Sequence, residues 1–204
     1  MNGRFEQQFN RSGYTLLGWG DVGQSRIFSK HEIARPSDLR SRRPWAPSTD
    51  EVFSEVLSVI GANPRRLGIT EVYPSLQTGM IDTVPGSAIA AVSLQWYTKL
   101  RYYSQQASGV LIGATILKKS KFGALSSEQQ EALMETSQRA HRLLQRAIRR
   151  EDERSLRVLD RRLTAVDNAA HEAEWRQVAE TARNNLAGRV YPRALLDAVM
   201  RARN

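Results

Sequence analysis

A glycine-rich stretch near the N-terminus has a spacing that could serve nucleotide chemistry. The segment Gly18–Gly23 (GWGDVG) matches the Gly-x-Gly-x-x-Gly fingerprint of dinucleotide-binding loops. In such loops the phosphate rests on the free N–H groups at the start of the next helix. The segment that follows here, Gln24–Lys30, has the pattern of a strand instead. We therefore expect no nucleotide at this stretch and no cofactor elsewhere in the chain.

The histidines and carboxylates do not form a catalytic pattern. The chain has no cysteine and no Gly-x-Ser-x-Gly sequence, and His31, His141 and His171 lie in unrelated contexts. We expect His141 on the solvated side of a helix. Asp82 is a lone carboxylate at a helix-to-strand junction, which is the position of a cap or turn residue rather than of a general base. No group of His, Asp and Glu has metal-ligand spacing. The sequence thus predicts no enzyme, no catalytic residue and no metal site.

Aromatic residues and the end of a strand could instead bind a ligand without chemistry. Indole rings stack well on the flat face of a ligand, although large aromatic residues fill the core at least as often. Ligands of open α/β sheets bind at the carboxyl ends of strands, and Pro85, Gly86 and Ser87 follow the expected strand Ile81–Val84. Ser87 could equally be the ordinary N-cap of the helix that comes next. Tyr73 could present its hydroxyl or pack on Val72 and Leu76. The residues predicted to bind a ligand are Trp19, Trp45, Tyr73, Pro85, Gly86, Ser87 and Trp96.

The charge balance raises the question of nucleic acid. The formal net charge is +9, and the excess comes from arginines scattered along the chain. No known nucleic-acid-binding module accompanies them, and a solvated surface accounts for such charges, so nucleic acid is not the expected partner. The alternative is nucleic-acid binding through one helix, and the affinity would then fall steeply as the salt concentration rises. Its residues would be Arg139, Arg142, Arg146, Arg149 and Arg150.

Composition sets the size and class of the fold. With 204 residues, 41% of them hydrophobic and 25% charged, the chain can bury one core or two small lobes. No run of about 18 apolar residues indicates a membrane span. Met1–Asn10 lacks the apolar region of a secretory signal.

The elements that would position these residues alternate between helix and strand. Runs broken by Gly and Pro over residues 14–47 predict strands joined by loops. Helices are expected over 48–61, 70–79 and 87–98, and strands over 81–84, 99–104 and 109–118. Ser48 with Glu51 has the spacing of a capping box, and Thr70 is the expected N-cap of the next helix. The last strand is nearly all apolar or small, so we expect cover on both of its faces. The alternation indicates an α/β fold.

One long helix is expected over residues 126–166. Ser126 and Gln129 have capping-box spacing, and a helical stripe of apolar residues continues to Val166. Roughly forty residues at about 1.5 Å each would span some 60 Å, more than the width of a small domain. The helix must therefore cross two lobes or project. Two terminal helices, over 171–186 and 192–203, are expected on either side of Gly188.

Two segments of the chain, Gly61–Pro64 and Tyr73–Asp82, resemble a signature of the solute receptors of TRAP (tripartite ATP-independent periplasmic) transporters. In that family an LGANP turn is followed by EVYxALQTGxIDG. Leu117–Lys119 and Leu125–Gln130 are similar to the family's strand ending in SKK and its LSPEDQ helix start. The resemblance runs from about residue 5 to residue 166. Two further segments of this chain, LGWGDVG with Trp19 and LQWYTK with Trp96, are similar to segments of a subtype of the family that has Trp-rich pockets.

Two departures from the family pattern bear on the ligand. Family members carry an arginine on the strand before this signature, where it pairs with a substrate carboxylate. Trp45 aligns best with that arginine, and Arg43, two residues earlier, could point the same way. A tryptophan there favours a flat or apolar ligand. Family members also have an N-terminal lobe and an export signal, and we expect this chain to lack both.

The resemblance implies an α/β fold: a periplasmic-binding-protein-like lobe with a long connecting helix and C-terminal helices, the N-terminal lobe missing. It implies an α/β ligand-binding lobe with hinge strands over 1–125, the connecting helix over 126–166 and a C-terminal helical segment over 167–204. The implied function is an extracytoplasmic solute-binding component that holds a small apolar, aromatic or carboxylate ligand and delivers it to TRAP membrane subunits in the periplasm. The alternative is a truncated lobe that is repurposed as a structural interaction protein. Such a lobe would form a homo-oligomer or be completed by a second chain. It would be cytoplasmic if the chain is complete as given.

Overall fold

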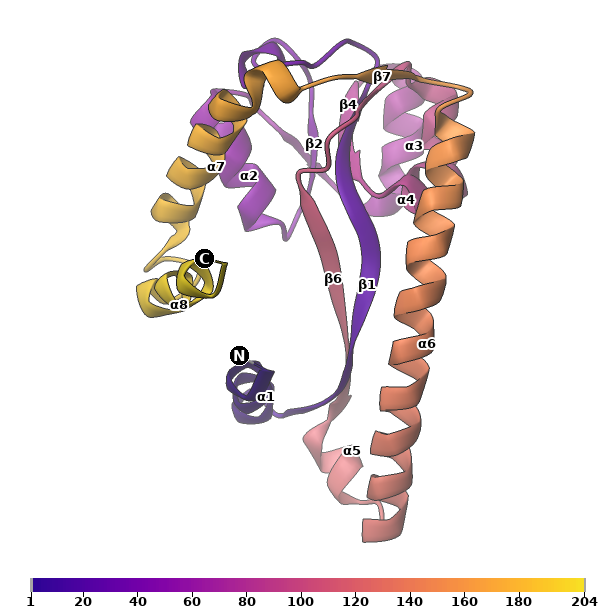
Figure 1. The fold of residues 1–204 in the computed structure, drawn as a ribbon, viewed down its shortest axis with the longest axis vertical. Coiled ribbons are helices and arrows are strands. Elements are labelled where there is room, and N and C mark those ends of the chain that lie inside the picture. Colours follow the sequence, from indigo (N-terminus) through magenta and orange to yellow (C-terminus); the bar gives the residue numbers. More distant parts are fainter. Residues whose placement is uncertain (1, 204) are drawn as a thin grey trace.

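The computed structural model describes residues 2–203 of the chain. One long strand, β1 (Tyr14–Ser29), and one long helix, α6 (Ser127–Leu159), run side by side over most of the molecule's length (Figure 1). The other strands are β2 (Trp45–Pro47), β3 (Arg65–Leu67), β4 (Thr83–Gly86), β5 (Tyr102–Ser104), β6 (Gly109–Lys118) and β7 (Thr164–Val166). The other α-helices are α1 (Asn2–Arg11), α2 (Glu51–Ile60), α3 (Ile69–Thr78), α4 (Ala88–Ser93), α5 (Lys119–Gly123), α7 (Glu172–Leu186) and α8 (Arg193–Arg203). Three short 3-10 helices are η1 (Pro36–Leu39), η2 (Trp96–Lys99) and η3 (Ala169–His171).

β1 joins two halves of the molecule, which we call the head (residues 26–104 and 152–186) and the stem (residues 2–25 and 109–151). In the head, β1 lies between β4 and β5 in a sheet of order β4-β1-β5-β7; it is antiparallel to both neighbours, and β5 is parallel to β7. In the stem, residues 14–25 of β1 pair antiparallel with β6, and the two strands form a ribbon that extends away from the head (Figure 1). This mixed sheet with helices around it confirms the α/β class.

Neighbouring residues of β1 point to opposite faces of the head sheet and so reach two different cores. Phe28 lies in one apolar cluster, together with Leu76 and Trp96. Ile27 lies in the other, together with Leu57. Helices α2 and α7 pack against each other on the side of the second cluster, and Trp175 of α7 packs against that cluster. Most of the buried apolar residues of the described chain therefore lie in the head.

The long helix α6 begins as expected and ends earlier than expected. The Ser126 hydroxyl accepts the Gln129 N–H at 3.2 Å, and the Gln129 side chain accepts the Ser126 N–H at 3.0 Å, which confirms the capping box. Its 33 residues correspond to about 50 Å. The expected continuation to Val166 is wrong, because residues 164–166 form β7 and their backbone pairs with β5. The spacing of Val166 from the apolar residues of α6 matches a helix by coincidence, and its side chain is buried in the head.

β6 is a strand, as expected, but the expected cover on both of its faces is wrong. Val110 and Ile112 leave 59% and 69% of their surface exposed, and no residue of β6 is buried. Among the described residues β6 pairs only with β1. An apolar run indicates a strand but carries no information on which layers surround it, and within residues 2–203 β6 is not covered on both faces.

Two helix starts differ from the expected ones. Asp50, not Ser48, caps α2: its carboxylate accepts the Phe53 N–H at 2.9 Å. Gly68, not Thr70, is the N-cap of α3. Ser48 and Thr70, the expected caps, each lie two positions from the true cap. The extended backbone at Asp50 and Gly68 makes these two residues the N-caps.

The expected helix ends at glycine are confirmed, and one helix is shorter than expected. Gly61 and Gly79 end α2 and α3 with φ of 82° and 78°, a left-handed conformation that glycine adopts without a steric penalty. The helix expected over 87–98 ends at Ser93. Gln95 has φ of 57°, which breaks the helix before η2 begins.

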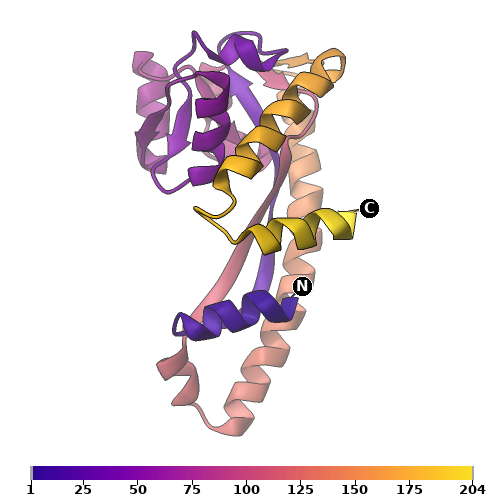
Figure 2. The ribbon, with the colours of Figure 1, turned by 90° about the vertical axis from the view of Figure 1, so that its left-hand side faces the viewer.

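The C-terminal part contains the two expected helices. α7 packs against α2 of the head, and α8 lies between the head and α1 in both views (Figures 1 and 2). No helix within residues 2–203 is long and apolar enough to cross a membrane. The start of α6 falls at the predicted border between 1–125 and 126–166, but the division of the chain into three parts stays a prediction.

Candidate functional site

Two of the predicted tryptophans meet inside the head. The rings of Trp45 and Trp96 lie edge to face, with their centroids 5.5 Å apart and their planes at 72°. Both side chains are part of the core, with 4% and 2% of their surface exposed. The Trp45 indole N–H donates to the Leu67 carbonyl at 2.9 Å. The pair therefore forms a fixed apolar wall rather than an open slot.

The end of β4 is the accessible edge of this wall. A Cβ added at Gly86 would lie 3.2 Å from Cζ3 of Trp96, so the strand passes close over the indole and a larger residue would displace it. Val84 is fully buried, whereas Pro85 and Gly86 are half-buried. These two residues bring the backbone from the tryptophan pair to the surface of the head.

The start of α4, just beyond Gly86, is already occupied by protein groups. The Ser87 hydroxyl accepts the Ala90 N–H at 3.3 Å, which is ordinary capping. The carboxylate of Asp152, a buried residue of α6, accepts the Ile89 N–H at 3.3 Å and the Gln24 N–H of β1 at 3.0 Å. These N–H groups at the start of α4 and in β1 are thus used to tie α4, α6 and β1 together.

Tyr73 is a residue of α3 that borders the tryptophan cluster. It packs against that cluster, and the ammonium of Lys99 lies 5.4 Å from the centre of its ring. A hydrogen bond from Thr98 and then the charge of Lys99 hold the pKa of the Tyr73 phenol below its ordinary value. Its hydroxyl therefore faces η2.

Trp19 is not brought together with the other predicted residues. It lies in the stem, where its ring centroid is 5.9 Å from that of Phe5 and 6.0 Å from that of Phe9, both on α1. Trp19 thus holds α1 against the ribbon. The structure brings Trp45, Tyr73, Gly86 and Trp96 together at one core of the head, with Pro85 and Ser87 on either side of Gly86 in the chain. Contact of any of the seven predicted residues with a ligand stays a prediction.

Arg26 is a candidate that sequence reasoning missed. It pairs with Gly86 across the sheet and has only 7% of its surface exposed. Its guanidinium donates to the carbonyls of Ser104, at 3.2 Å, and Gln105, and to the Gln24 side chain at 3.1 Å. Among the described residues no carboxylate forms an ion pair with it. The signal in the sequence is an arginine directly before the apolar residues Ile27 and Phe28 of a strand, which points to a charge buried for a reason.

Arg43 and Trp45 have different partners, and which of them corresponds to the family's arginine stays open. The Nε of Arg43 lies 3.3 Å from Oδ2 of Asp82, whereas the Trp45 ring lies against Trp96. Asp82 is buried and also accepts the Arg43 N–H at 2.9 Å and the Thr83 hydroxyl at 3.0 Å. The structural role expected for Asp82 is confirmed, and Arg43 is committed to it.

His141 is half-buried, and both of its ring nitrogens have protein partners. Its Nε2 lies 2.8 Å from the Thr115 hydroxyl, and its Nδ1 lies 2.6 Å from the Ser137 carbonyl. The ring covers Gly18 of β1, where an added Cβ would lie 2.5 Å from Nδ1. Although α6 is polar along this stretch, it lies on the ribbon, and a polar helix face is then an interface rather than a solvated surface.

The glycine-rich fingerprint is part of strand β1 and holds a carboxylate. Asp21 accepts the Gly23 N–H at 2.9 Å and forms an ion pair with Arg149 of α6 at 2.9 Å. The Gly23 N–H and then Arg149 hold the pKa of Asp21 below its ordinary value. Arg149, one of the five arginines of the nucleic-acid alternative, is therefore already paired. Within residues 2–203 no group of three His, Asp or Glu residues could hold a metal ion.

Residues 2–188 match the family model DctP, described as bacterial extracellular solute-binding protein, family 7. The chain is 30% identical over 156 residues to a solute-binding protein of Roseobacter denitrificans, a match that covers 74% of this chain and 47% of the relative. It is 29% identical over 130 residues to the 2,3-diketo-L-gulonate-binding periplasmic protein of Escherichia coli, covering 62% and 37%. The chain thus spans less than half the length of these curated relatives.

Solved structures share the fold at lower identity. A TRAP periplasmic solute-binding protein of Shewanella oneidensis with bound succinate superposes with a TM-score of 0.91 and 18% identity, over 99% of this chain and 67% of that one. A second, from a Sulfitobacter species with bound β-D-galacturonate, superposes with a TM-score of 0.86 and 18% identity, over 92% and 63%. The expected periplasmic-binding-protein-like fold is confirmed.

Proposed function

The chain belongs to family 7 of the bacterial extracellular solute-binding proteins, and we propose from this that it is the solute-binding component of a TRAP-type transporter. It binds a small organic solute without chemical change and passes it to the membrane subunits of that transporter. The periplasm is where such a component works, as members of the family do. The family is one of receptors and not of enzymes, which agrees with a role in binding alone.

The observation that carries this proposal is the crossing of β1 and α6 between head and stem. Receptors of this class close two parts around a solute, and such closure needs continuous segments that pass from one part to the other. β1 pairs with β4 in the head and with β6 in the stem, and α6 follows it along both. The buried Asp152 fixes α6 to β1 and α4 at the junction. The face that would close on a solute is the end of β4, next to Trp45, Trp96, Pro85 and Gly86.

The ligand class follows from the charge buried at this face. Arg26 pairs with Gly86 across the sheet, and its buried guanidinium is directed to the neighbouring end of β5, where all its partners among the described residues are neutral. A carboxylate that approached the end of β4 would gain from this charge at low effective dielectric. Related proteins carry succinate, galacturonate or 2,3-diketo-L-gulonate in their names, and all three are organic acids. We therefore propose an organic acid, with its apolar part directed to the tryptophan wall.

Titration calorimetry against a panel of acids and their neutral counterparts tests the proposal. The panel holds hexuronates, aldonates, C4-dicarboxylates and aromatic carboxylates, each with the matching sugar or amide. We expect saturable binding of at least one acid and much weaker binding of its neutral counterpart. Arg26→Lys should weaken that binding at least about tenfold, since an ammonium does not reproduce the guanidinium geometry.

The matched control is Arg65→Lys, which changes an exposed arginine of β3. It should leave the affinity unchanged, and denaturation curves of both variants show whether they fold. A folded Arg26→Lys variant that binds like the original protein would place the carboxylate elsewhere. A folded chain that binds no member of the panel would contradict the receptor proposal itself. The alternative of a repurposed interaction protein finds no support in the family match or in the solved structures.

A further inference from the structure

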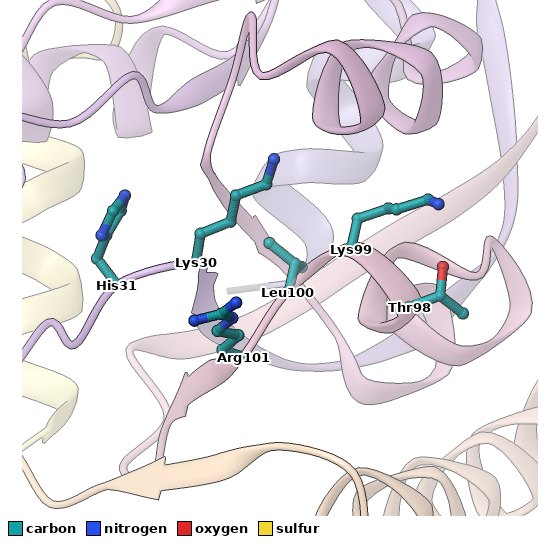
Figure 3. A pocket seen from close by; sticks show the side chains of 6 residues that line it. All are labelled: Lys30, His31, Thr98, Lys99, Leu100 and Arg101. Atoms are coloured by element: carbon teal, nitrogen blue, oxygen red, sulfur yellow. The ribbon is translucent and has the colours of Figure 1, made fainter.

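A basic pocket of about 520 Å³ lies at the far end of the head from the proposed solute-binding face. Two segments line it: the residues just after β1 and the residues that lead into β5 (Figure 3). Its lining residues are Lys30, His31, Thr98, Lys99, Leu100 and Arg101. A cavity of this size accommodates a small molecule.

The charge in the pocket is of one sign. Lys30, Lys99 and Arg101 each contribute a positive charge, and none of the lining residues is acidic. The carboxylate beside His31 is Asp82, which lies 3.9 Å from Nε2, is buried and already pairs with Arg43. A concave surface with three cations and no acid raises the local concentration of anions.

Two of the three cations are held in place. The Lys30 ammonium donates to the Leu76 carbonyl at 2.6 Å, and the Lys99 ammonium rests over the ring of Tyr73. Each contact fixes a long side chain with donors to spare, which lowers the entropy that binding would otherwise cost. Arg101 uses its backbone N–H to bind the Ser29 carbonyl, and its guanidinium is exposed. The lining of the pocket therefore contains one exposed guanidinium, a donor fork suited to oxyanions, and two positioned ammonium groups.

The pocket is separate from the face at Pro85 and Gly86. In the register of the sheet, Ser29 pairs with Thr83 and Arg26 pairs with Gly86. Lys30 follows Ser29, so the pocket lies at the Thr83 end of β4. The two ends of β4 are about 10 Å apart, since a strand rises about 3.3 Å per residue. One small molecule bound in the pocket would not reach Arg26.

We propose that this pocket binds a small multivalent oxyanion, a phosphate group or a di- or tricarboxylate. The ammonium groups of Lys30 and Lys99 and the guanidinium of Arg101 donate to its oxygens. The site adds an anion-binding function to the head that is independent of the transported solute.

Calorimetry on the full 204-residue chain tests the site, with inorganic phosphate and citrate as the two probes and chloride at matched ionic strength as the reference. Matching the ionic strength keeps the screening constant. The two arms separate a phosphate site from a carboxylate site. Arg101→Gln and Lys99→Met should each lower the affinity for the tighter-binding probe roughly three- to fivefold, which is the contribution of a partly solvated ion pair. The double variant should lower that affinity about tenfold or more. Lys121→Met, an exposed lysine of α5 in the stem, is the control that removes the same charge elsewhere.

Three outcomes decide the proposal. Saturable binding that is lost in the pocket variants and kept in Lys121→Met supports it. Equal weakening in all three variants would show an effect of net charge and would overturn it. No saturable binding of either probe, or binding no tighter than that of chloride, would also overturn it. Arg26→Lys should leave phosphate binding unchanged, so that failure of the oxyanion site and failure of the solute-binding proposal give different results.

Discussion

At the scale of single residues, the protonation of Tyr103 is coupled to folding. Burial first, and then the hydrogen bond that its hydroxyl donates to Asp160, raise the pKa of Tyr103 to about 12. In the unfolded chain the pKa of a tyrosine is about 10. Between pH 10 and 12 the unfolded chain therefore loses this proton while the folded chain keeps it, and the free energy of unfolding falls. Below pH 10 the contribution is fully present.

Tyr103→Phe should remove this part of the alkaline loss of stability. We expect the urea midpoint of the original protein to fall more between pH 9 and pH 11 than that of the variant. The neighbouring Tyr102→Phe is the matched control and should follow the original protein. Equal alkaline shifts for the original protein and Tyr103→Phe would show that this phenol does not set the response.

The contact between Gly18 and His141 gives a second prediction for single residues. An added methyl group at Gly18 would overlap the imidazole, so Gly18→Ala should cost about 1–3 kcal/mol of unfolding free energy. In a His141→Ala background the overlap is gone and the same substitution should cost much less. Gly20→Ala is the control, because an added Cβ there is 3.7 Å from the nearest atom, an ordinary contact.

Urea denaturation of the four proteins in this double-mutant cycle measures the coupling. A coupling energy near zero would mean that α6 does not lie on the ribbon at this point.

Single residues also show where the sequence was ambiguous. Trp45 and Trp96 were predicted as ligand contacts with the core as the alternative, and their rings are buried against each other. Trp19 has the same residue type and a similar context, yet it contacts α1 in the stem. Residue type fixes the apolar area that a tryptophan must bury, but the partner depends on long-range packing, which a single sequence does not contain.

At the scale of elements, Asp152 ties three of them together. Its two carboxylate oxygens accept N–H groups from β1 and from the start of α4, at 3.0 and 3.3 Å. Asp152→Ala leaves these donors unpaired next to the core and should lower the unfolding free energy by about 1–3 kcal/mol. Asp152→Asn keeps one acceptor oxygen and should cost less.

Chemical denaturation measures these changes, with Glu153→Ala as the control. Glu153 is the next residue of α6 and is exposed, so its loss should change stability by less than about 0.5 kcal/mol. Equal effects of Asp152→Ala and Glu153→Ala would mean that the junction is held by other contacts.

Local sequence signals predicted elements well where chemistry within a few residues decides. The cap at Ser126 and the stops at Gly61 and Gly79 are such cases. The end of α6 at Leu159 is not, because β7 exists only through its pairing with β5, some sixty positions earlier in the chain. The packing of layers around β6 is a third kind of feature. The apolar residues of β6 indicate a strand, but only the tertiary arrangement shows that one partner strand, β1, is present.

At the scale of the whole molecule, the head and the stem differ in how they are stabilised. The head contains both apolar clusters, whereas in the stem β6 has no buried residue and, among the described residues, pairs only with β1. An isolated two-stranded ribbon is marginal in water, so α6 and α1 must supply most of the stem's support. The family signature and the proposed solute face both lie in the head or at its border with the stem.

Amide hydrogen exchange followed by mass spectrometry should resolve this difference. We expect the amides of β6 to exchange much faster than those of α3 and of residues 26–29 of β1, because local opening of the ribbon exposes little new apolar surface. The two parts of β1 form an internal comparison, since residues 14–22 belong to the stem and residues 26–29 to the head. Asp152→Ala should raise exchange in the segment between them, where the Gln24 N–H loses its acceptor. Uniform protection along β1 and β6 would show that the stem is as stable as the head, and the division that supports closure around a solute would then have to be abandoned.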